Sequence, residues 1–353
     1  FGLHDLCHAV IRAAGRTYAG SHGGLGMLSL TRECDAELRA SGMTTLTLPY
    51  ALGNIANKSL LPRFENAETV WRKLATVRSL KDFKPATTVR FLLGAEGLKK
   101  VGKDGRLQHL ALGDSSSTYS LGTRGGIIAI TRTDYLNDDL GVFTEVPGLM
   151  GELFAVALEE EFFKVYMGRT DWITSGTNQN SQTGAGTALD ITSLTAAQLL
   201  FGNRVINNRP ITTSAKFLVV GTALKVKGMD LTTQQKILAS VTKNANQEFT
   251  NNPHAGTLDL VITPYLNNTA IKDADGAAIS GQSTTLWFLQ ADPNVLPTEI
   301  VGFLNGRQAP YVEVDGIGTW NSEFDVLGCQ MRVFGDFGVG AGETYGVVRS
   351  IGA

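Results

Sequence analysis

The sequence predicts an α+β fold, and three segments carry that prediction. Residues 144–168 have the apolar spacing of a long helix, 85–126 alternate like a two-stranded hairpin, and 216–314 mix short strands with helices. At ~1.5 Å per residue the helix is on the order of 36 Å long, which is more than a small domain requires. A projecting hairpin is marginal in water, so the fold class itself indicates support from other subunits.

The N-terminal segment 1–45 is predicted to be an arm. Its first part, 1–16, has the spacing of a short amphipathic helix, and 17–45 are rich in Gly, Ser and Thr. Such an arm buries little surface against its own body and would gain order by lying on another subunit. A further helix is predicted over 66–80, around Trp71.

Alternating side chains predict the strands of the hairpin 85–126. The first strand is expected over Thr87–Leu93, the second around 119–123, and Ile127–Thr131 continue as a strand. The stretch between the two runs, Gly97–Gly113, is polar and rich in glycine. It predicts a loose, charged hairpin tip.

The helix over 144–168 has clear end signals. Thr144 can cap it, Pro147 is tolerated in its first turn, and Gly168 can end it. Glu152, Glu159, Glu160 and Lys164 are expected mostly on the solvated side, opposite an apolar stripe. That predicted stripe consists of Val146, Leu149, Met150, Leu153, Phe154, Ala157, Leu158, Phe162, Val165 and Tyr166.

The rest of the chain alternates between short predicted elements. A polar, glycine-rich loop is expected over 174–188, and helices over 193–202 and 231–249. A glycine-rich connection is expected over Gly335–Gly342. Strands are predicted at Phe217–Val220, Leu258–Thr263, Leu286–Gln290, Ile300–Leu304, Tyr311–Val314, Phe324–Val326, Gln330–Phe334 and Thr344–Val348.

Composition excludes several classes of protein. The net charge is −2, from 31 basic and 33 acidic residues, whereas a domain that grips nucleic acid by its phosphates usually has a basic excess. The cysteines Cys7, Cys34 and Cys329 are odd in number and far apart, which argues against a disulfide framework and favours folding in a reducing cytoplasm. No apolar run reaches the ~20 residues of a membrane helix.

One segment approaches a nucleotide-binding motif. Gly97–Asp104 has the spacing of a P-loop, but Asp104 stands where the Mg²⁺-binding Ser or Thr should be, and Gly105 follows where a helix should begin. A flexible hairpin tip is the better interpretation. Lys99, Lys100 and Lys103 in this tip are most simply solubilising charges.

Two other clusters resemble chemical sites. His4, Cys7 and His8 could share a helix face and bind zinc, but the sequence offers no matching second cluster. Gly113-Asp114-Ser115 resembles a hydrolase nucleophile block, yet the histidines that could act as its base, His109 and His254, show no fitting pattern. The acidic run Glu159–Glu161 is interpreted as a solvated helix face. We therefore predict no catalytic, cofactor-binding or metal-binding residues, and no cofactor.

Four groups of residues resemble one known family. They are Leu52–Lys58 with Trp71 and Lys81–Lys84; Ile130–Arg132 with Asn137–Gly141 and Phe143; Phe303–Gly306 with Pro310 and Tyr311; and Asp336–Gly338. In this order they are similar to the Mu-type major head subunit T, a branch of the tailed-bacteriophage major capsid proteins with the Hong Kong phage (HK-type) fold. The resemblance covers about 46–353.

The resemblance implies a domain map. It comprises an N-terminal arm at 1–45, an extended hairpin loop at 85–126 and an axial domain at 206–322. The peripheral domain would combine three parts, 46–84, 127–205 and 323–353. The second of these parts contains the spine helix 144–168.

The resemblance also implies a function, namely a structural protein that catalyses nothing. Hexamers and pentamers of the chain would form an icosahedral shell around double-stranded DNA in the virion, after assembly in the host bacterial cytoplasm. A portal, decoration or scaffold proteins and a prohead protease would be partners, without membrane or sequence-specific DNA binding. A start at Phe1 would fit trimming by that protease, and a crosslink from the tip lysines to Asn321 is a disfavoured variant.

Three alternatives remain open from the sequence. An encapsulin-like nanocompartment would use the same fold to store enzymes. A hydrolase or nucleotide-binding enzyme would be built around Gly97–Asp104 or Gly113–Ser115 and would be a monomer or small oligomer. A minor or decoration protein of a phage fits less well, because the chain has the full layout of spine and lobe.

Overall fold

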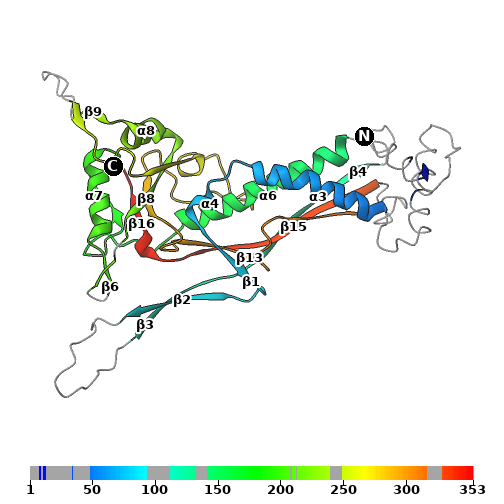
Figure 1. Cartoon of the computed structure of the whole chain (residues 1–353), viewed down its shortest axis with the longest axis horizontal. Coiled ribbons are helices and arrows are strands. Elements are labelled where there is room, and N and C mark those ends of the chain that lie inside the picture. Colours follow the sequence, from blue (N-terminus) through cyan, green and yellow to red (C-terminus); the bar gives the residue numbers. More distant parts are fainter. Residues whose placement is uncertain are drawn as a thin grey trace, which may run out of the picture. The chain divides into compact units, whose positions relative to one another are not determined.

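The computed structural model describes 48–93, 112–131, 141–206, 209–211, 213–238, 249–315 and 328–352, together with His8, Ile11, Arg12 and Cys34 (Figure 1). The chain forms two compact units, which are treated separately below. The first contains Phe1–Glu68, Thr123–Val156 and Arg307–Asp336, and the second contains Thr69–Gly122, Ala157–Gly306 and Phe337–Ala353. The predicted arm and its helix lie outside the described residues, except that His8, Ile11, Arg12 and Cys34 are helical.

In its described residues the first unit contains α3 (Leu48–Asn66), β14 (Tyr311–Asp315) and parts of α6 (Gly141–Met167), β4 (Gly122–Thr131) and β15 (Gly328–Ala341). Helix α3, which the sequence did not predict, contacts β14, and the Phe64 ring packs 6.1 Å from the Phe154 ring of α6. Strand β14 pairs antiparallel with β15, and β4 also pairs with β15.

The predicted long helix is confirmed as α6 (Gly141–Met167), which begins three residues early, so that Thr144 lies inside it and does not cap it. Met150, Phe154, Leu158, Phe162 and Tyr166 are buried as predicted. Leu149 and Leu153 were wrongly placed in the apolar stripe and are exposed. Each lies one position before a buried residue, about 100° around the helix, so the real stripe is narrower than predicted.

Three other predictions are wrong. Apart from Asn66, which ends α3, only α4 (Trp71–Leu74) is helical within 66–80, because β1 (Thr76–Leu80) pairs in parallel with β13 (Glu299–Leu304). Helix α8 spans Lys225–Thr233 and ends where the Asn252 side chain donates to the carbonyls of Leu231 and Gln234. The predicted helix 231–249 therefore gives way to β9 (Lys236–Leu238), which pairs antiparallel with β10 (Phe249–Asn251). The third is the expected connection Gly335–Gly342, most of which belongs to β15.

The second unit contains a five-stranded mixed sheet in the order β11 (Asp259–Thr263), β8 (Ala215–Gly221), β12 (Trp287–Ala291), β16 (Val347–Ser350), β5 (Ser181–Gln182). Strands β8 and β11 are parallel, and β12 is antiparallel to both of its neighbours. Strands β8, β11, β12, β13 and β16 confirm the predicted ones to within three residues, whereas β5 lies in the stretch 174–188 that was predicted to be a loop. Phe324–Val326 lies outside the described residues. Shorter elements are β6 (Val205–Ile206), β7 (Arg209–Pro210), η1 (Thr222–Leu224), η2 (Pro264–Leu266) and η3 (Thr344–Gly346).

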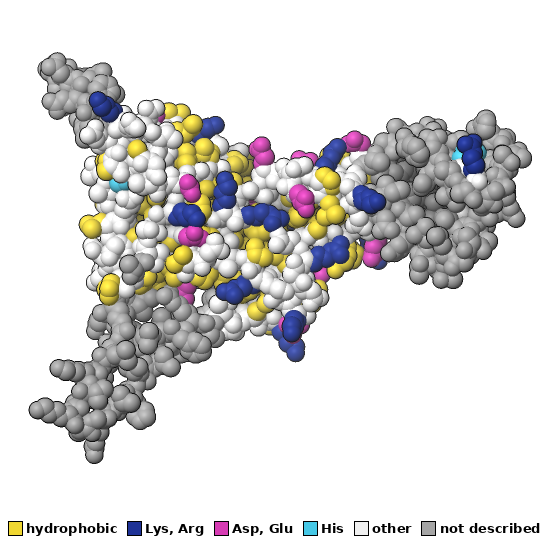
Figure 2. Space-filling model, in the orientation of Figure 1, with side chains coloured by type: hydrophobic (Ala, Val, Ile, Leu, Met, Phe, Trp, Pro, Cys, Tyr) yellow, Lys and Arg dark blue, Asp and Glu magenta, His cyan; other side chains and the backbone are white. Residues whose placement is uncertain are grey.

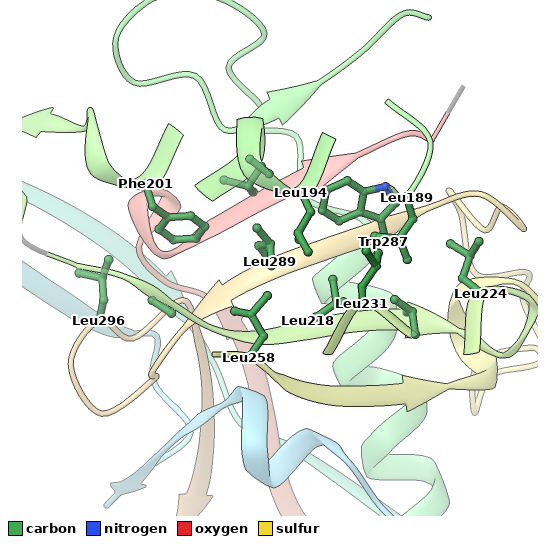
Figure 3. Close-up of a cluster of buried hydrophobic side chains, with 14 residues drawn as sticks. Leu189, Leu194, Phe201, Leu218, Leu224, Leu231, Leu258, Trp287, Leu289 and Leu296 are labelled. Atoms are coloured by element: carbon green, nitrogen blue, oxygen red, sulfur yellow. The ribbon is translucent and has the colours of Figure 1, made fainter. Parts of the chain in front are cut away.

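Helix α7 (Ile191–Gly202), also predicted, contributes to the main core of this sheet (Figure 3). Asp190 caps the helix by accepting from the Ser193 backbone N–H, and the Ser193 hydroxyl accepts from the Asp190 backbone N–H. Its buried Leu194 and Phe201 pack in a cluster with Trp287, whose indole N–H donates to the Thr187 carbonyl at 3.0 Å. The polar end of the indole is therefore satisfied inside the core.

Close approach explains the glycines of β15. A Cβ at Gly338 would overlap the carbonyl oxygen of Ser120, and one at Gly340 would overlap the Tyr119 side chain. On the neighbouring strand β13, a Cβ at Gly302 would lie 2.8 Å from the Tyr119 ring. The glycines therefore form a floor for Tyr119, and β15 tolerates them because it pairs with strands β13 and β14.

We predict that Gly340→Ala lowers the free energy of unfolding by about 1–3 kcal/mol, because the added methyl must displace Tyr119. Denaturant titration of the soluble chain measures this change. The matched control is Gly126→Ala in β4, whose added Cβ would meet nothing within 4 Å. Equal losses in the two variants would contradict the packing argument.

Candidate assembly surfaces

The predicted hairpin is present as two paired strands, β2 (Ala86–Leu93) and β3 (Leu112–Tyr119). They run antiparallel in continuous register, from Ala86 opposite Tyr119 to Leu93 opposite Leu112. The second strand lies earlier than the predicted 119–123, because backbone pairing with β2 includes the polar run that was assigned to the tip. Among the described strands, β2 and β3 pair only with each other.

The base of the ribbon β2–β3 is fixed by Tyr119 and Leu121, which are both buried. Tyr119 lies on the floor formed by Gly302 and Gly340. Burial raises the pKa of its phenol, while the positive charge of Arg78 opposes the shift. The ribbon is thus held at one end by packing, and among the described strands β2 and β3 have only each other as backbone partners.

A cleft of about 940 Å³ opens beside the base of the ribbon. Its walls include Arg78, Ser116, Lys164 and Asp171. Two of these charged groups are already engaged: the ammonium of Lys164 lies 2.8 Å from a carboxylate oxygen of Asp273, and Asp171 binds Arg169. Arg78 adds a further positive charge to the wall of the cleft.

A buried ionic cluster lies directly after α6. The guanidinium of Arg169 donates to both carboxylate oxygens of Asp171, at 3.0 and 2.6 Å, and to Glu299 at 2.7 Å. It also donates to the Thr298 carbonyl at 2.8 Å. The side chains of Arg169 and Glu299 are 1% and 0% exposed. The cluster therefore joins the end of α6 to the start of β13.

The charges of this cluster are not balanced. Burial raises the pKa of Glu299 to about 7 despite the nearby Arg169, and the second carboxylate oxygen of Glu299 has no hydrogen-bond partner. Burial opposes ionisation of Arg169 too, but its hydrogen bonds and its charge contacts with Asp171 and Glu299 raise its pKa overall. One cation faces two carboxyls, so a proton on Glu299 would restore neutrality.

Glu159 corrects the expectation of a solvated acidic face on α6. Its side chain is buried, and one carboxylate oxygen accepts from the backbone N–H of Val70 at 3.1 Å. Burial raises its pKa to about 7. The sequence hides this residue because Glu160 and Glu161 follow it and suggest a uniformly polar run.

The chemical motifs found in the sequence do not converge. Gly97–Asp104, the tip lysines, Asn321 and His109 lie outside the described residues, as do His4 and Cys7. Gly113–Ser115 lies within the strand β3, so it forms no nucleophile turn. His254 is buried with its ring nitrogen 2.9 Å from the Thr195 hydroxyl, and burial lowers its pKa. Within the described part of the chain, no three His, Cys, Asp or Glu residues could hold a metal ion.

Residues missed by sequence reasoning include Arg169 and Glu299. The signal for Glu299 is a lone acid at the start of the apolar run 300–304, because a carboxylate in a buried strand needs a partner. Its partner could not be found from spacing, since Arg169 lies in a distant part of the chain.

Figure 2 shows no basic stripe among the described residues of the face that it draws. On the face drawn in Figure 2, basic and acidic side chains are interspersed among the described residues. This distribution agrees with the near-neutral net charge of −2. No described helix is long and apolar enough to cross a membrane.

Known proteins resemble this chain in sequence and in fold. A sequence model of the family described as phage capsid protein matches residues 114–350. No curated protein matches the chain.

Solved capsid structures cover most of the chain. That of the cyanophage P-SCSP1u matches with a TM-score of 0.53 at 15% identity, covering 80% of this chain and 88% of that chain. Structures from Mycobacterium phage Ogopogo and Microbacterium phage Oxtober96 match with TM-scores of 0.49 and 0.47, both at 12% identity. They cover 80% of this chain and 92% and 90% of theirs.

We predict that Arg169→Met lowers the free energy of unfolding by about 3–5 kcal/mol, because it leaves the buried Glu299 without its cation. The control is Arg332→Met, which breaks the ion pair between Arg332 and Glu313. The two side chains of this pair are 62% and 48% exposed, so we expect the control to lose about 0–1 kcal/mol of unfolding free energy. Denaturant titration compares the two variants. A similar loss in both would contradict a special role for the buried cluster.

Glu159→Gln tests the raised pKa of that carboxyl. A pKa of about 7 in the folded state, against 4.5 in the unfolded chain, means that the protonated carboxyl stabilises the fold below pH 4.5. That contribution is lost as the pH rises from 4.5 through 7. The amide keeps the acceptor for Val70, so we expect Glu159→Gln to be more stable than the parent at pH 8 by about 1–3 kcal/mol and nearly equal at pH 4.5.

Unfolding midpoints measured across this pH range provide the check. Glu152→Gln, at an exposed position of the same helix, is the control and should follow the parent curve. If the unfolding midpoint of Glu159→Gln differs from that of the parent by the same amount at every pH, the raised pKa of Glu159 would be contradicted.

Proposed function

This chain belongs to the phage capsid protein family, and on that basis we propose that its subunits join as hexamers and pentamers through contacts that reach beyond their globular units. It is a major capsid protein of a tailed bacteriophage, a structural component of the virion that assembles into the icosahedral shell. It is not an enzyme, so the hydrolase and nucleotide-binding alternatives are set aside. The fold matches that of a phage capsid over 80% of the chain, and the predicted HK-type fold is confirmed.

The domain map is part of the proposal. The arm would be 1–45, the extended loop 85–126, the axial domain 206–322, and the peripheral domain the rest of the chain. Strand pairing crosses some of these boundaries: β13 and β14 pair with β15, and β16 pairs with β12. A division that follows the sheets would therefore move 299–315 to the peripheral domain and 347–350 to the axial one.

Membership of the Mu-type head subunit T branch is a finer proposal. Three of the residues that carry that resemblance, Asn305, Gly306 and Gly338, stand at constrained points of the backbone, which supports it. Asn305 and Gly306 end β13 in a turn with φ of 51° and 74°, and Gly338 touches the Ser120 carbonyl. Such positions keep their residue types because few others fit.

The single observation that carries the assembly mechanism is the ribbon β2–β3, which pairs with no other described strand. A two-stranded ribbon is marginal alone, and a neighbouring subunit in a shell would supply the missing surface. Heterologous contacts of this kind close into rings. Each can be weak, because every subunit is held by several neighbours at once.

Contents and partners follow from the same proposal. The shell would enclose double-stranded DNA, and a near-neutral wall would not hold that DNA by its phosphates. A portal, decoration or scaffold proteins and a prohead protease would act with the subunit, and assembly would take place in the bacterial cytoplasm.

Expression of the whole chain, followed by size-exclusion chromatography and electron microscopy, tests the proposal. We predict closed shells or ring-shaped capsomers. A stable monomer would contradict it, and shells that hold enzyme cargo and no nucleic acid would favour the nanocompartment alternative.

A shortened ribbon tests the mechanism separately. Thr88 and Ser117 face each other in register, so the segment between them can be replaced by a two-residue Asn-Gly turn without altering the anchored base. We expect this variant to fold with the parent's unfolding midpoint and to lose shell formation. Shells at the parent's yield would show that the ribbon is not an assembly element.

A further inference from the structure

The cleft beside the base of the ribbon β2–β3 has the size of a ligand site. Its volume of about 940 Å³ is within the range of pockets that take small organic molecules. The residues that line it all belong to the second unit. Thr88 and Ser117 come from the two strands of the ribbon, and Arg78 comes from β1. A molecule in the cleft would therefore touch the ribbon and the body of the unit together.

A guanidinium and a hydroxyl lie together next to Tyr119. Ser117 is two residues before the buried Tyr119, so both side chains lie on the same face of β3, and Thr88 is opposite Ser117 in the ribbon. The Thr88 side chain hydrogen-bonds the Tyr119 phenol, and the charge of Arg78 acts on that phenol. Arg78 is itself opposite Gly302, which is part of the floor under Tyr119. Arg78 and Ser117 therefore share one end of the cleft.

Arg78 differs from the other charged residues of the wall in having no counter-ion. Lys164 is held by a buried carboxylate, and Arg169 and Asp171 bind each other. Glu343, the remaining carboxylate of the wall, has an interaction of its own. Arg78 is exposed and forms no ion pair with any other described residue. The end of the cleft next to Tyr119 thus presents an unpaired cation.

Other parts of the wall are hydroxylic or apolar. Ser116 and Thr170 add hydroxyls to that of Ser117, and the apolar lining includes Ile300 and Val295. The Val295 side chain is 66% exposed. Ligand sites typically combine apolar walls with a few polar groups that fix orientation. An occupant that uses both kinds of wall carries an anionic group and an apolar part.

We propose that this cleft binds a small organic phosphate, with the phosphate group on Arg78 and Ser117 and the apolar part against Val295. A guanidinium holds phosphate oxygens through two parallel hydrogen bonds, and a hydroxyl can turn its hydrogen toward an anion. Phosphate fits a wall with several hydroxyls better than carboxylate does, because it offers three strong acceptor oxygens. The bound molecule restricts movement of the ribbon at its base. The inference concerns a ligand of the subunit and does not depend on how subunits assemble.

Isothermal titration calorimetry of the purified chain with phenyl phosphate tests the site. We expect Arg78→Met to weaken binding at least about tenfold and to keep the parent's unfolding midpoint, because the side chain is exposed. Arg332→Met removes an exposed arginine of the first unit and should bind like the parent. No binding by the parent at millimolar phenyl phosphate, or equal binding by Arg78→Met and the parent, would overturn the inference.

The apolar wall is tested separately. We expect phenyl phosphate to bind at least about tenfold more tightly than inorganic phosphate, because only the ester can cover Val295. Val295→Ser should weaken the binding of phenyl phosphate and leave that of inorganic phosphate unchanged. Tighter binding of benzoate than of phenyl phosphate would overturn the choice of phosphate.

Hydrogen exchange locates the bound molecule. We expect phenyl phosphate to slow amide exchange at the base of the ribbon, in 86–88 and 117–119, and to leave α7 unchanged, because the ligand bridges ribbon and body. Binding that leaves exchange at the base of the ribbon as fast as in the free chain would overturn the placement in this cleft.

Discussion

Unpaired strand edges are the physical constraint on which this account depends. Backbone N–H and C=O groups are obligatory hydrogen-bonding groups, and a strand that leaves them unpaired depends on water or on another chain. Among the described strands, both strands of the ribbon β2–β3 and strand β4 have such an edge, as do β1, β11 and β5 at the ends of the larger sheets. A structural protein that must join its own copies has a use for edges that an isolated protein would have to protect.

The globular part of the subunit, by contrast, has a filled hydrophobic core. Trp287 and its neighbours fill the core of the second unit, and the indole N–H is satisfied. Arg169 ties the end of α6 to β13, and Tyr119 rests on glycines of β13 and β15. The base of the ribbon is therefore anchored by packing within the second unit.

The spacing of apolar residues along the sequence predicted those helices and strands whose type depends on neighbouring residues. The apolar spacing of α6 and the alternation of β2 gave the correct element type, because burial on one side determines both. The parallel strand β1 was mistaken for helix, since Trp71, Leu74 and Val77 keep a helical spacing and its partner β13 lies far along the chain. The glycines of β15 suggested a loop, because their role depends on Tyr119 and Ser120, which no local pattern connects to them.

The candidate surfaces were predicted in outline only. The hairpin could be anticipated from alternation and its need for a partner from physics, but the exposed edge of β4 depends on which strand β15 accepts as a neighbour. Glu159 and Glu299 were hidden for the same reason, because their burial is a property of tertiary packing.

Electron cryo-microscopy of shells assembled from the whole chain tests the central claim most directly. The account predicts density in which the β2–β3 ribbon of each subunit lies on a neighbouring copy. A ribbon folded back on its own subunit, with its edges paired there, would contradict it.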